Sequence, residues 1–128
     1  MAGNGQQFKA GANIEPSVFV KLSADNKVIT GTANAEVIGI MHESTWDAPI
    51  PGNTATYAVP SGQSKRVYQV TESCELEVAV DIDAGEKIAS DANGKGILAT
   101  AGNPYGAVCT QGATAGGKAK VLVSIGVA

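Results

Sequence analysis

Alternation of apolar and polar residues is the main pattern along this chain. It is clearest in CELEVAVDI, residues 74–82, where Cys74, Leu76, Val78, Val80 and Ile82 alternate with Glu75, Glu77, Ala79 and Asp81. A period of two predicts a strand with one face in the core and the other in water. The C-terminal residues alternate in the same way, with Ala119, Val121, Val123, Ile125 and Val127 on one face.

Shorter apolar segments predict further strands. They are SVFVKL (17–22), KVIT (27–30), EVIGIM (36–41), RVYQV (66–70), GILAT (96–100) and GAVC (106–109). Gly, Asn, Asp and Pro separate these segments at intervals of roughly 8–12 residues, as in an antiparallel sandwich or barrel. Helical periodicity is missing apart from one short helix expected around Thr32–Glu36. The fold class predicted is mainly β, a small barrel or sandwich of short antiparallel strands with little helix.

Two parts of the chain resemble each other in sequence. The matched pairs are KAGANI (9–14) with DAGEKI (83–88), ADNKVITGTA (24–33) with DANGKGILATA (91–101), and VIGI (37–40) with YGAV (105–108). In both copies an Asn-containing turn joins two short strands, and Asn-Gly is a favoured hairpin turn because its central positions need positive φ. We interpret the pattern as two related hairpin modules that face each other across one core. Chance similarity between short hairpins is the alternative.

The chain length of 128 residues favours one domain. We expect a flexible N-terminal arm at residues 1–8, followed by a single β domain at residues 9–128 with a long inserted loop at residues 42–66. A connection of that length is usually functional or mobile. The arm is polar and contains glycine, so it could order on a partner by adding a strand to a sheet edge. A frayed terminus is the alternative.

The inserted loop contains Trp46, the only tryptophan, together with Tyr57 and three of the five prolines. Aromatic residues are favoured anchors of protein interfaces, although Trp46 could equally close one end of a barrel. The residues expected at a contact with a partner come from the arm and from this loop. They are Gln6, Gln7, Phe8, Trp46, Pro49, Ile50, Pro51 and Tyr57.

Composition and charge exclude several classes of function. The formal net charge is −3 and the basic residues are scattered, with Lys65-Arg66 the only adjacent pair, so we expect no direct contact with nucleic acid. No apolar run approaches a membrane span and the N-terminus has no apolar signal core, so we expect no membrane partner and synthesis in a cytoplasm. Charged residues make up only 16% of the chain, against about 25% in a typical domain.

Residues that could carry chemistry do not form a known motif. GATAGGKA (112–119) approximates a phosphate-binding loop, but Ala119 replaces the Ser or Thr that holds Mg²⁺, and a strand follows instead of a helix. His42 is the only histidine, and no nucleophile motif accompanies it. Asp81, Asp83 and Glu86 lack the spacing of a calcium loop. We expect no cofactor, no metal and no catalytic activity.

Cys74 and Cys109 lack the spacing of a metal or redox motif. Buried free thiols are the simplest interpretation. A disulfide stays open as the alternative, because pairing depends on geometry that the sequence does not give.

The order of these motifs resembles the decoration, or capsid cement, proteins of tailed bacteriophages. The resemblance covers residues 9–125: an Ala-Gly turn, VFVKLSADNKVITGTA (18–33), VIGIM (37–41), a variable middle, AGEKIASDANGKGILATAG (84–102), YGAV (105–108) and VLVSI (121–125). It implies a β-tulip fold and a homotrimer, or in some relatives a dimer. It also implies a place on the outer surface of the expanded capsid in the virion, where the major capsid protein is the partner and the shell is stabilised against internal DNA pressure.

A second function is compatible with the same pattern. The chain could be a small β-barrel module that binds a ligand or a carbohydrate without catalysis. A carrier domain is a related alternative, since Lys27 and Lys95 lie near hairpin turns, but neither has the flanking Met favoured in lipoyl or biotinyl carriers.

Overall fold

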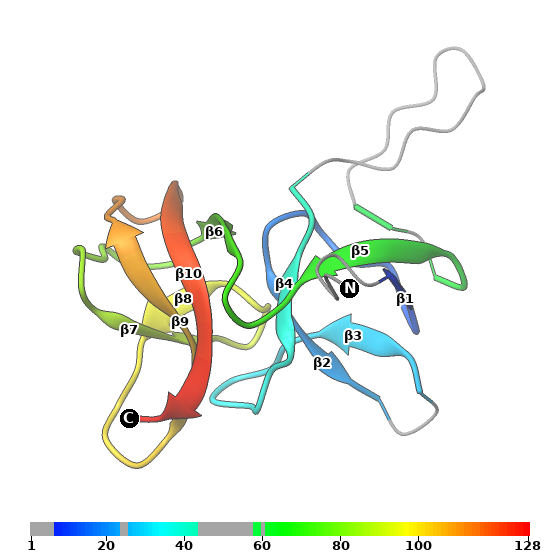
Figure 1. Ribbon diagram of the computed structural model, residues 1–128, viewed down its shortest axis with the longest axis horizontal. Helices are drawn as coiled ribbons and strands as arrows, with labels where there is room; N and C mark the ends of the chain where they lie inside the picture. Colours follow the sequence, from blue (N-terminus) through cyan, green and yellow to red (C-terminus); the bar gives the residue numbers. More distant parts are fainter. Residues whose placement is uncertain (1–6, 24–25, 44–57, 60) are drawn as a thin grey trace.

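The computed structural model describes residues 7–23, 26–43, 58–59 and 61–128, which form two antiparallel five-stranded sheets (Figure 1). The strands are β1 (Gln7–Lys9), β2 (Phe19–Leu22), β3 (Val28–Thr30), β4 (Gly39–Met41), β5 (Ser64–Tyr68), β6 (Ser73–Glu77), β7 (Lys87–Ser90), β8 (Gly96–Leu98), β9 (Pro104–Gln111) and β10 (Lys118–Val127). None of the described residues is helical. The predicted mainly β class is confirmed as a sandwich, since the sheets do not close into a barrel.

The two sheets have the same topology. Strand order is β1-β5-β4-β2-β3 in the first sheet and β6-β10-β9-β7-β8 in the second, so adding five to each strand number converts one order into the other. We call residues 7–68 the N-terminal lobe and residues 73–128 the C-terminal lobe. Figure 1 shows the lobes side by side along the long axis of the molecule. The chain is therefore a tandem duplication of one five-stranded unit.

The register of strand pairing repeats as well. A shift of 68 residues carries the β2–β3 pairs onto the β7–β8 pairs, and it also carries the β2–β4 pairs onto the β7–β9 pairs. Even the isolated bridges correspond between the lobes. Matching pairs are Val20–Thr30 with Ile88–Leu98, Ala10–Val28 with Val78–Gly96, and Ile14–Val59 with Ile82–Ala113.

Turn chemistry repeats at the same positions. Four residues with positive φ in the N-terminal lobe have counterparts with positive φ in the C-terminal lobe: Ser17 with Gly85, Asn26 with Gly94, Asn34 with Gly102, and Gly62 with Gly116. Glycine enters the left-handed region at no steric cost, and Asn tolerates it better than most residues. The turn residues noticed in the sequence are thus the visible part of a duplication that includes every strand.

The lobes differ in length at one connection. Between Met41 and Val59 the chain advances by 18 positions, whereas between their counterparts Cys109 and Ala113 it advances by four, which leaves 14 extra residues in the N-terminal lobe. These 14 residues fall between Glu43 and Ala58. We call residues 44–57 the insertion; they lie outside the described residues.

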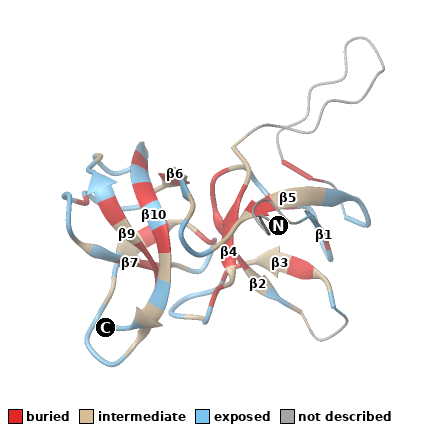
Figure 2. Ribbon diagram, viewed as in Figure 1, coloured by how far each residue is buried: buried red, intermediate tan, exposed pale blue. Residues whose placement is uncertain are grey.

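Buried apolar side chains form two clusters instead of the single core expected from the sequence (Figure 2). One cluster lies within the N-terminal lobe and includes Ile14, Val20, Met41 and Val67. The other fills the C-terminal lobe but also contains Phe19, Val37 and Ile40 of the N-terminal lobe. Each sheet is too small to enclose a large core, so the second cluster extends across the junction and holds the lobes together.

Several boundaries predicted from the sequence were wrong. Residues 32–36 form a turn and no helix, because Asn34 has φ +54° and its amide donates to the Ser90 carbonyl. KAGANI aligns with residues 77–82, not with DAGEKI, since the 68-residue shift holds along the whole segment. The strand predicted at residues 74–82 ends at Glu77, and Val80 is exposed.

The ends of the chain and of the loop also differ from expectation. Gln7 and Phe8 were assigned to the flexible arm, but they belong to β1, which pairs with β5. The loop predicted at residues 42–66 ends earlier, because Ala58 and Val59 are buried in the N-terminal cluster and β5 begins at Ser64. At the C-terminus Ile125 and Val127 are exposed instead of inward-facing, since a bulge interrupts the β9–β10 register after Val123.

Candidate functional site

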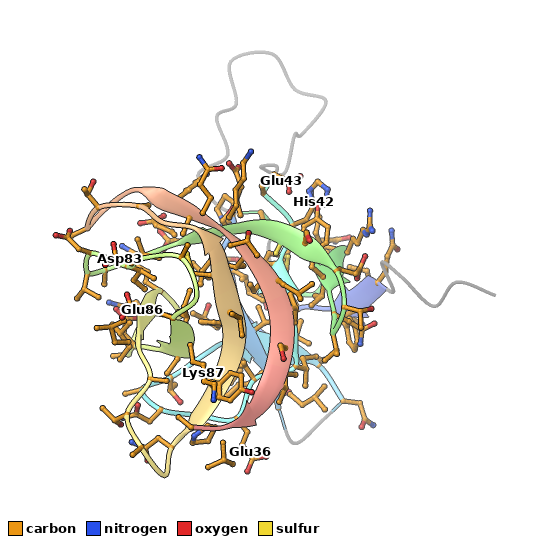
Figure 3. All side chains as sticks on the ribbon, turned by 60° about the vertical axis from the view of Figure 1, so that its left-hand side comes forward. Glu36, His42, Glu43, Asp83, Glu86 and Lys87 are labelled. Atoms are coloured by element: carbon orange, nitrogen blue, oxygen red, sulfur yellow. The ribbon has the colours of Figure 1, made fainter. Side chains whose placement is uncertain are left out.

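The root of the insertion carries a network of polar and aromatic side chains at the ends of β4 and β5. The Tyr68 hydroxyl donates to Glu43 Oε1 at 2.8 Å, and the His42 ring stacks on the Tyr68 ring with centroids 5.4 Å apart. Nε2 of His42 lies 3.1 Å from Glu43 Oε2. Figure 3 shows His42 and Glu43 next to each other beyond the end of β4. These contacts fix the direction in which the chain leaves the N-terminal sheet.

Arg66 extends the network. Its guanidinium carbon lies 5.0 Å from the Tyr68 ring centroid, a cation–π arrangement. Nη2 of Arg66 donates to Glu72 Oε2 at 2.8 Å, while Glu72 Oε1 accepts from the Gln69 amide at 2.8 Å. The network thus connects the root of the insertion to the segment that joins the two lobes.

The electrostatics of this network favour a neutral tyrosine. Burial, followed by the hydrogen bond to Glu43, raises the pKa of Tyr68 from 10.0 to about 12, although Arg66 acts in the opposite direction. A phenol that stays protonated at neutral pH serves as a hydrogen-bond donor and not as a base. The geometry therefore supports a structural role, in which Tyr68 holds the Glu43 carboxylate in place.

The C-terminal lobe has no equivalent of this network. The counterparts of His42, Glu43, Arg66 and Tyr68 are Thr110, Gln111, Lys120 and Leu122. There the Thr110 hydroxyl donates to the Lys120 carbonyl at 3.0 Å, and the short connection needs no further support. The network and the insertion are thus two features that the lobes do not share, and we take them together as the candidate binding site.

The structure places only two of the eight contact residues predicted from the sequence. Gln7 is exposed in β1, whereas Phe8 is partly buried and packs against the N-terminal cluster, so part of its side chain supports the fold. Gln6, Trp46, Pro49, Ile50, Pro51 and Tyr57 lie outside the described residues. Sequence reasoning did not single out Tyr68, Arg66 or Glu72, because two alternate residues of β5 and a glutamate in the connection after it form no known motif.

The acidic turn and the 112–118 loop have structural roles. Asp81 Oδ1 accepts from the Ala115 amide at 2.8 Å, and Glu86 Oε1 accepts from the Asp83 amide at 2.7 Å. These bonds stabilise two turns that lie against each other. Within the described ranges no group of three or more His, Cys, Asp or Glu residues could hold a metal ion. The described part of the chain also contains no helix long and apolar enough to cross a membrane.

Both cysteines are free thiols, as the simplest interpretation predicted. Cys74 and Cys109 pair with Val121 from opposite sides of β10, so a whole strand separates them and they do not bond to each other. Burial, with smaller contributions from Glu43, Glu72 and Glu75, raises the pKa of Cys74 from 9.0 to about 12. Burial also raises the pKa of Cys109.

The raised thiol pKa values predict that alkaline pH destabilises the fold. A group whose folded pKa is raised contributes stability that is present below its unfolded pKa, here 9.0, and is lost as pH rises toward about 12. We expect the urea midpoint to fall between pH 9 and pH 10, before Tyr68 titrates in the unfolded chain. Cys74→Ala should make that fall shallower, with Cys109 accounting for the rest. An unchanged pH dependence in this variant would refute the assignment.

Comparison with known proteins finds similarity at the level of structure. No protein-family model matches the sequence, and no curated protein matches it. Among solved structures, the chain is similar to one described as the crystal structure of head fiber gp8.5 N base in bacteriophage phi29. The similarity has a TM-score of 0.57 at 16% sequence identity, and it covers 94% of this chain and 92% of that one. Both lobes are therefore included in the shared fold.

Proposed function

We propose that this chain is a structural protein of a bacteriophage virion: a decoration protein that binds the outer surface of the expanded head and stabilises it against internal DNA pressure. The observation that carries the proposal is the fold shared with the base of a phage head fiber along nearly the whole of both chains. The motif order in residues 9–125 resembles decoration proteins independently of that likeness. In this proposal the chain acts by binding alone, without catalysis.

The proposed partners are the major capsid protein and further copies of this chain. The insertion supplies the capsid contact, through Trp46, Pro49, Ile50, Pro51 and Tyr57. Its root is held by the Tyr68 network. Gln7, at the edge of the first sheet, supplies a second contact together with the preceding Gln6. The β-tulip fold and a homotrimer complete the proposal.

Deletion of residues 44–57 tests this contact. The C-terminal lobe shows that the connection closes without those residues, so joining Glu43 to Ala58 should leave the fold intact and the melting temperature within a few degrees of wild type. We expect the wild-type protein to co-sediment with expanded, undecorated heads of its own phage at a saturable ratio. The deletion should weaken that binding at least tenfold.

Two matched variants sharpen the experiment. A Gly/Ser segment of equal length in place of residues 44–57 should bind as weakly as the deletion, because it lacks the aromatic and proline side chains. Leu122→Ser, which changes an exposed apolar residue on the C-terminal lobe, should bind heads like wild type. Wild-type protein that does not saturate the heads would refute the proposed function, and a deletion that binds normally would refute the assigned contact.

A further inference from the structure

The contact between the two lobes is made by different surfaces of the repeated unit. From the N-terminal lobe it uses a surface centred on Ser17, Phe19 and Asn34, which we call the leading face. From the C-terminal lobe it uses a surface centred on Glu77, Ser90 and Gly94, which we call the hairpin face because it includes the β7–β8 turn. The amides of Phe19, Glu77 and Asn34 donate to the carbonyls of Gly94 (2.7 Å), Ser17 (2.8 Å) and Ser90 (2.9 Å).

Because the two lobes contact each other through different faces, each lobe keeps one unused face, which makes no contact with the other lobe. The leading face of the C-terminal lobe is centred on Gly85, Lys87 and Gly102, and the hairpin face of the N-terminal lobe is centred on Lys9, Leu22 and Asn26. Figure 1 places the β2–β3 hairpin and the C-terminal end of the chain at opposite ends of the long axis. Head-to-tail contacts of this type propagate from copy to copy and form a ring where the rotation closes, or an open filament where it does not.

One pair of counterparts shows that the hairpin face of the N-terminal lobe is exposed where that of the C-terminal lobe is buried. Ser90 is 1% exposed because it lies in the contact between the lobes, whereas its counterpart Leu22 is 55% exposed. A large aliphatic side chain at the equivalent of a buried junction position indicates a surface that becomes covered in the assembled protein.

The unused leading face contains an open pocket of about 380 Å³, lined by Gly85, Glu86, Lys87, Leu98, Ala99 and Ala128. The counterparts of Glu86, Lys87 and Leu98 in the N-terminal lobe are Val18, Phe19 and Thr30. Gly94 of the β7–β8 turn covers these residues so closely that a Cβ on Gly94 would lie 2.8 Å from the Phe19 carbonyl oxygen. The unused hairpin carries Asn26 in place of Gly94. Because a Cβ on Gly94 would meet the Phe19 carbonyl, Asn26 would have to lie slightly farther from β7 than Gly94 lies from β2, with its side chain in the open pocket.

The backbone of β7 offers the same hydrogen bond as that of β2. The Phe19 carbonyl accepts from Gly31 at 2.8 Å, and the Lys87 carbonyl accepts from Ala99 at 3.0 Å. A residue hydrogen-bonded in this way directs its amide and its carbonyl to the same side of the strand. The Lys87 amide therefore points toward the pocket, as the Phe19 amide points toward Gly94.

Charges on the two unused faces are complementary. Within the chain, Lys95 and Glu77 form an ion pair at 3.1 Å, and the pKa of Lys95 is raised first by Glu77 and further by Glu15 of the other lobe. The counterparts of Lys95 and Glu77 are both lysines, Lys27 and Lys9.

The leading face of the C-terminal lobe supplies the opposite charge. Asp83 replaces Glu15 and Glu86 replaces Val18, so two carboxylates would face the lysines of the hairpin face. Figure 3 shows Asp83, Glu86 and Lys87 along one side of the C-terminal lobe. Lys87 is the basic exception, and its Nζ lies 5.1 Å from the centroid of the Tyr105 ring.

We propose that a second copy of this chain occupies the pocket of the C-terminal lobe with its β2–β3 hairpin, so that copies join head to tail through a contact of the same type as the one that joins the lobes. In the homotrimer of the proposed function, three copies would close a ring of six lobes. This proposal specifies the self-association in the proposed function and does not depend on binding to a capsid.

Disulfide trapping tests the contact directly. A Cβ on Gly31 would lie 2.7 Å from Ser90 Oγ, and the counterparts of this pair are Ala99 and Leu22. Between two copies these positions therefore fall within the reach of a disulfide. The double variant Leu22→Cys/Ala99→Cys should form linked chains under mild oxidation in solution without heads, with the ladder ending at three. A longer ladder would refute the ring.

Control variants separate this geometry from chance collisions. Leu22→Cys/Leu122→Cys pairs two exposed positions that do not face each other in the proposed contact, and it should cross-link at least tenfold more slowly. Single Leu22→Cys protein should not cross-link with itself, whereas mixed with single Ala99→Cys protein it should give dimers. Equal cross-linking of all variants, or efficient dimers of single Leu22→Cys protein, would overturn the proposal. Head binding is measured separately, so either proposal can fail alone.

Discussion

Replacing Phe19 with alanine should lower the free energy of unfolding by about 3–5 kcal/mol, the usual cost of truncating a buried phenylalanine. Phe19 is fully buried, and although it belongs to the N-terminal lobe it lies in the cluster of the C-terminal lobe. Its ring packs against Gly106 so closely that a Cβ there would lie 2.6 Å from the ring. The loss would be a large share of the roughly 5–15 kcal/mol that stabilise a typical domain.

Phe8→Ala is the matched control for this effect. Phe8 is only partly buried, and it packs against the cluster of the N-terminal lobe without reaching the junction. Its truncation should cost about 1–2 kcal/mol, in proportion to the smaller apolar area removed from water. Urea unfolding followed by circular dichroism gives both values. A Phe19 variant no less stable than the Phe8 variant would show that the junction contributes little to folding.

Gly94→Ala should destabilise the protein by about 3 kcal/mol or more, through backbone strain and a steric clash acting together. Gly94 has φ +78°, and a Cβ at this position would lie 2.8 Å from both the Phe19 carbonyl and Thr30 Cγ2. The carbonyl cannot move away easily, because it accepts from the Gly31 amide at 2.8 Å. The substitution therefore forces the β7–β8 hairpin away from the N-terminal lobe.

Gly102→Ala isolates the contribution of backbone strain. Gly102 has φ +86°, but nothing lies within 4 Å of a Cβ built there. It should therefore cost only about 1–2 kcal/mol, the penalty of a left-handed alanine. The difference between the two variants measures the contact between the lobes. If both variants lost the same free energy, the close packing of Gly94 against the N-terminal lobe would be disproved.

Local patterns predicted the strands well because each strand has one buried face. Alternation of apolar residues located β6, β10 and most shorter strands, and the Asn and Gly turns revealed that one hairpin occurs twice. The sequence could not show that all five strands repeat. At the remaining positions the counterparts, such as Gln7 and Glu75 or Arg66 and Lys120, share a pairing register and little side-chain identity.

The candidate site was predictable only in part. The unusual length and the aromatic content of the connection directed attention to residues 42–66, and the duplication narrows the exceptional part to residues 44–57. Tyr68, Arg66 and Glu72 were missed because their partners come from other segments: Arg66 and Tyr68 on β5 meet Glu43 after β4 and Glu72 after β5 only in the fold. The sequence could not predict the two unused faces either. A face can be recognised as unused only when the structure shows that its counterpart in the other lobe is covered.

The temperature at which DNA-filled heads of the native phage release their DNA tests the proposed function most directly. Heads lacking this protein should release DNA at a lower temperature than heads to which the wild-type protein has been added back to saturation. Protein without residues 44–57 should restore little of the difference. Heads that bind the wild-type protein and yet release DNA at the same temperature as bare heads would contradict stabilisation of the shell as the function of this chain.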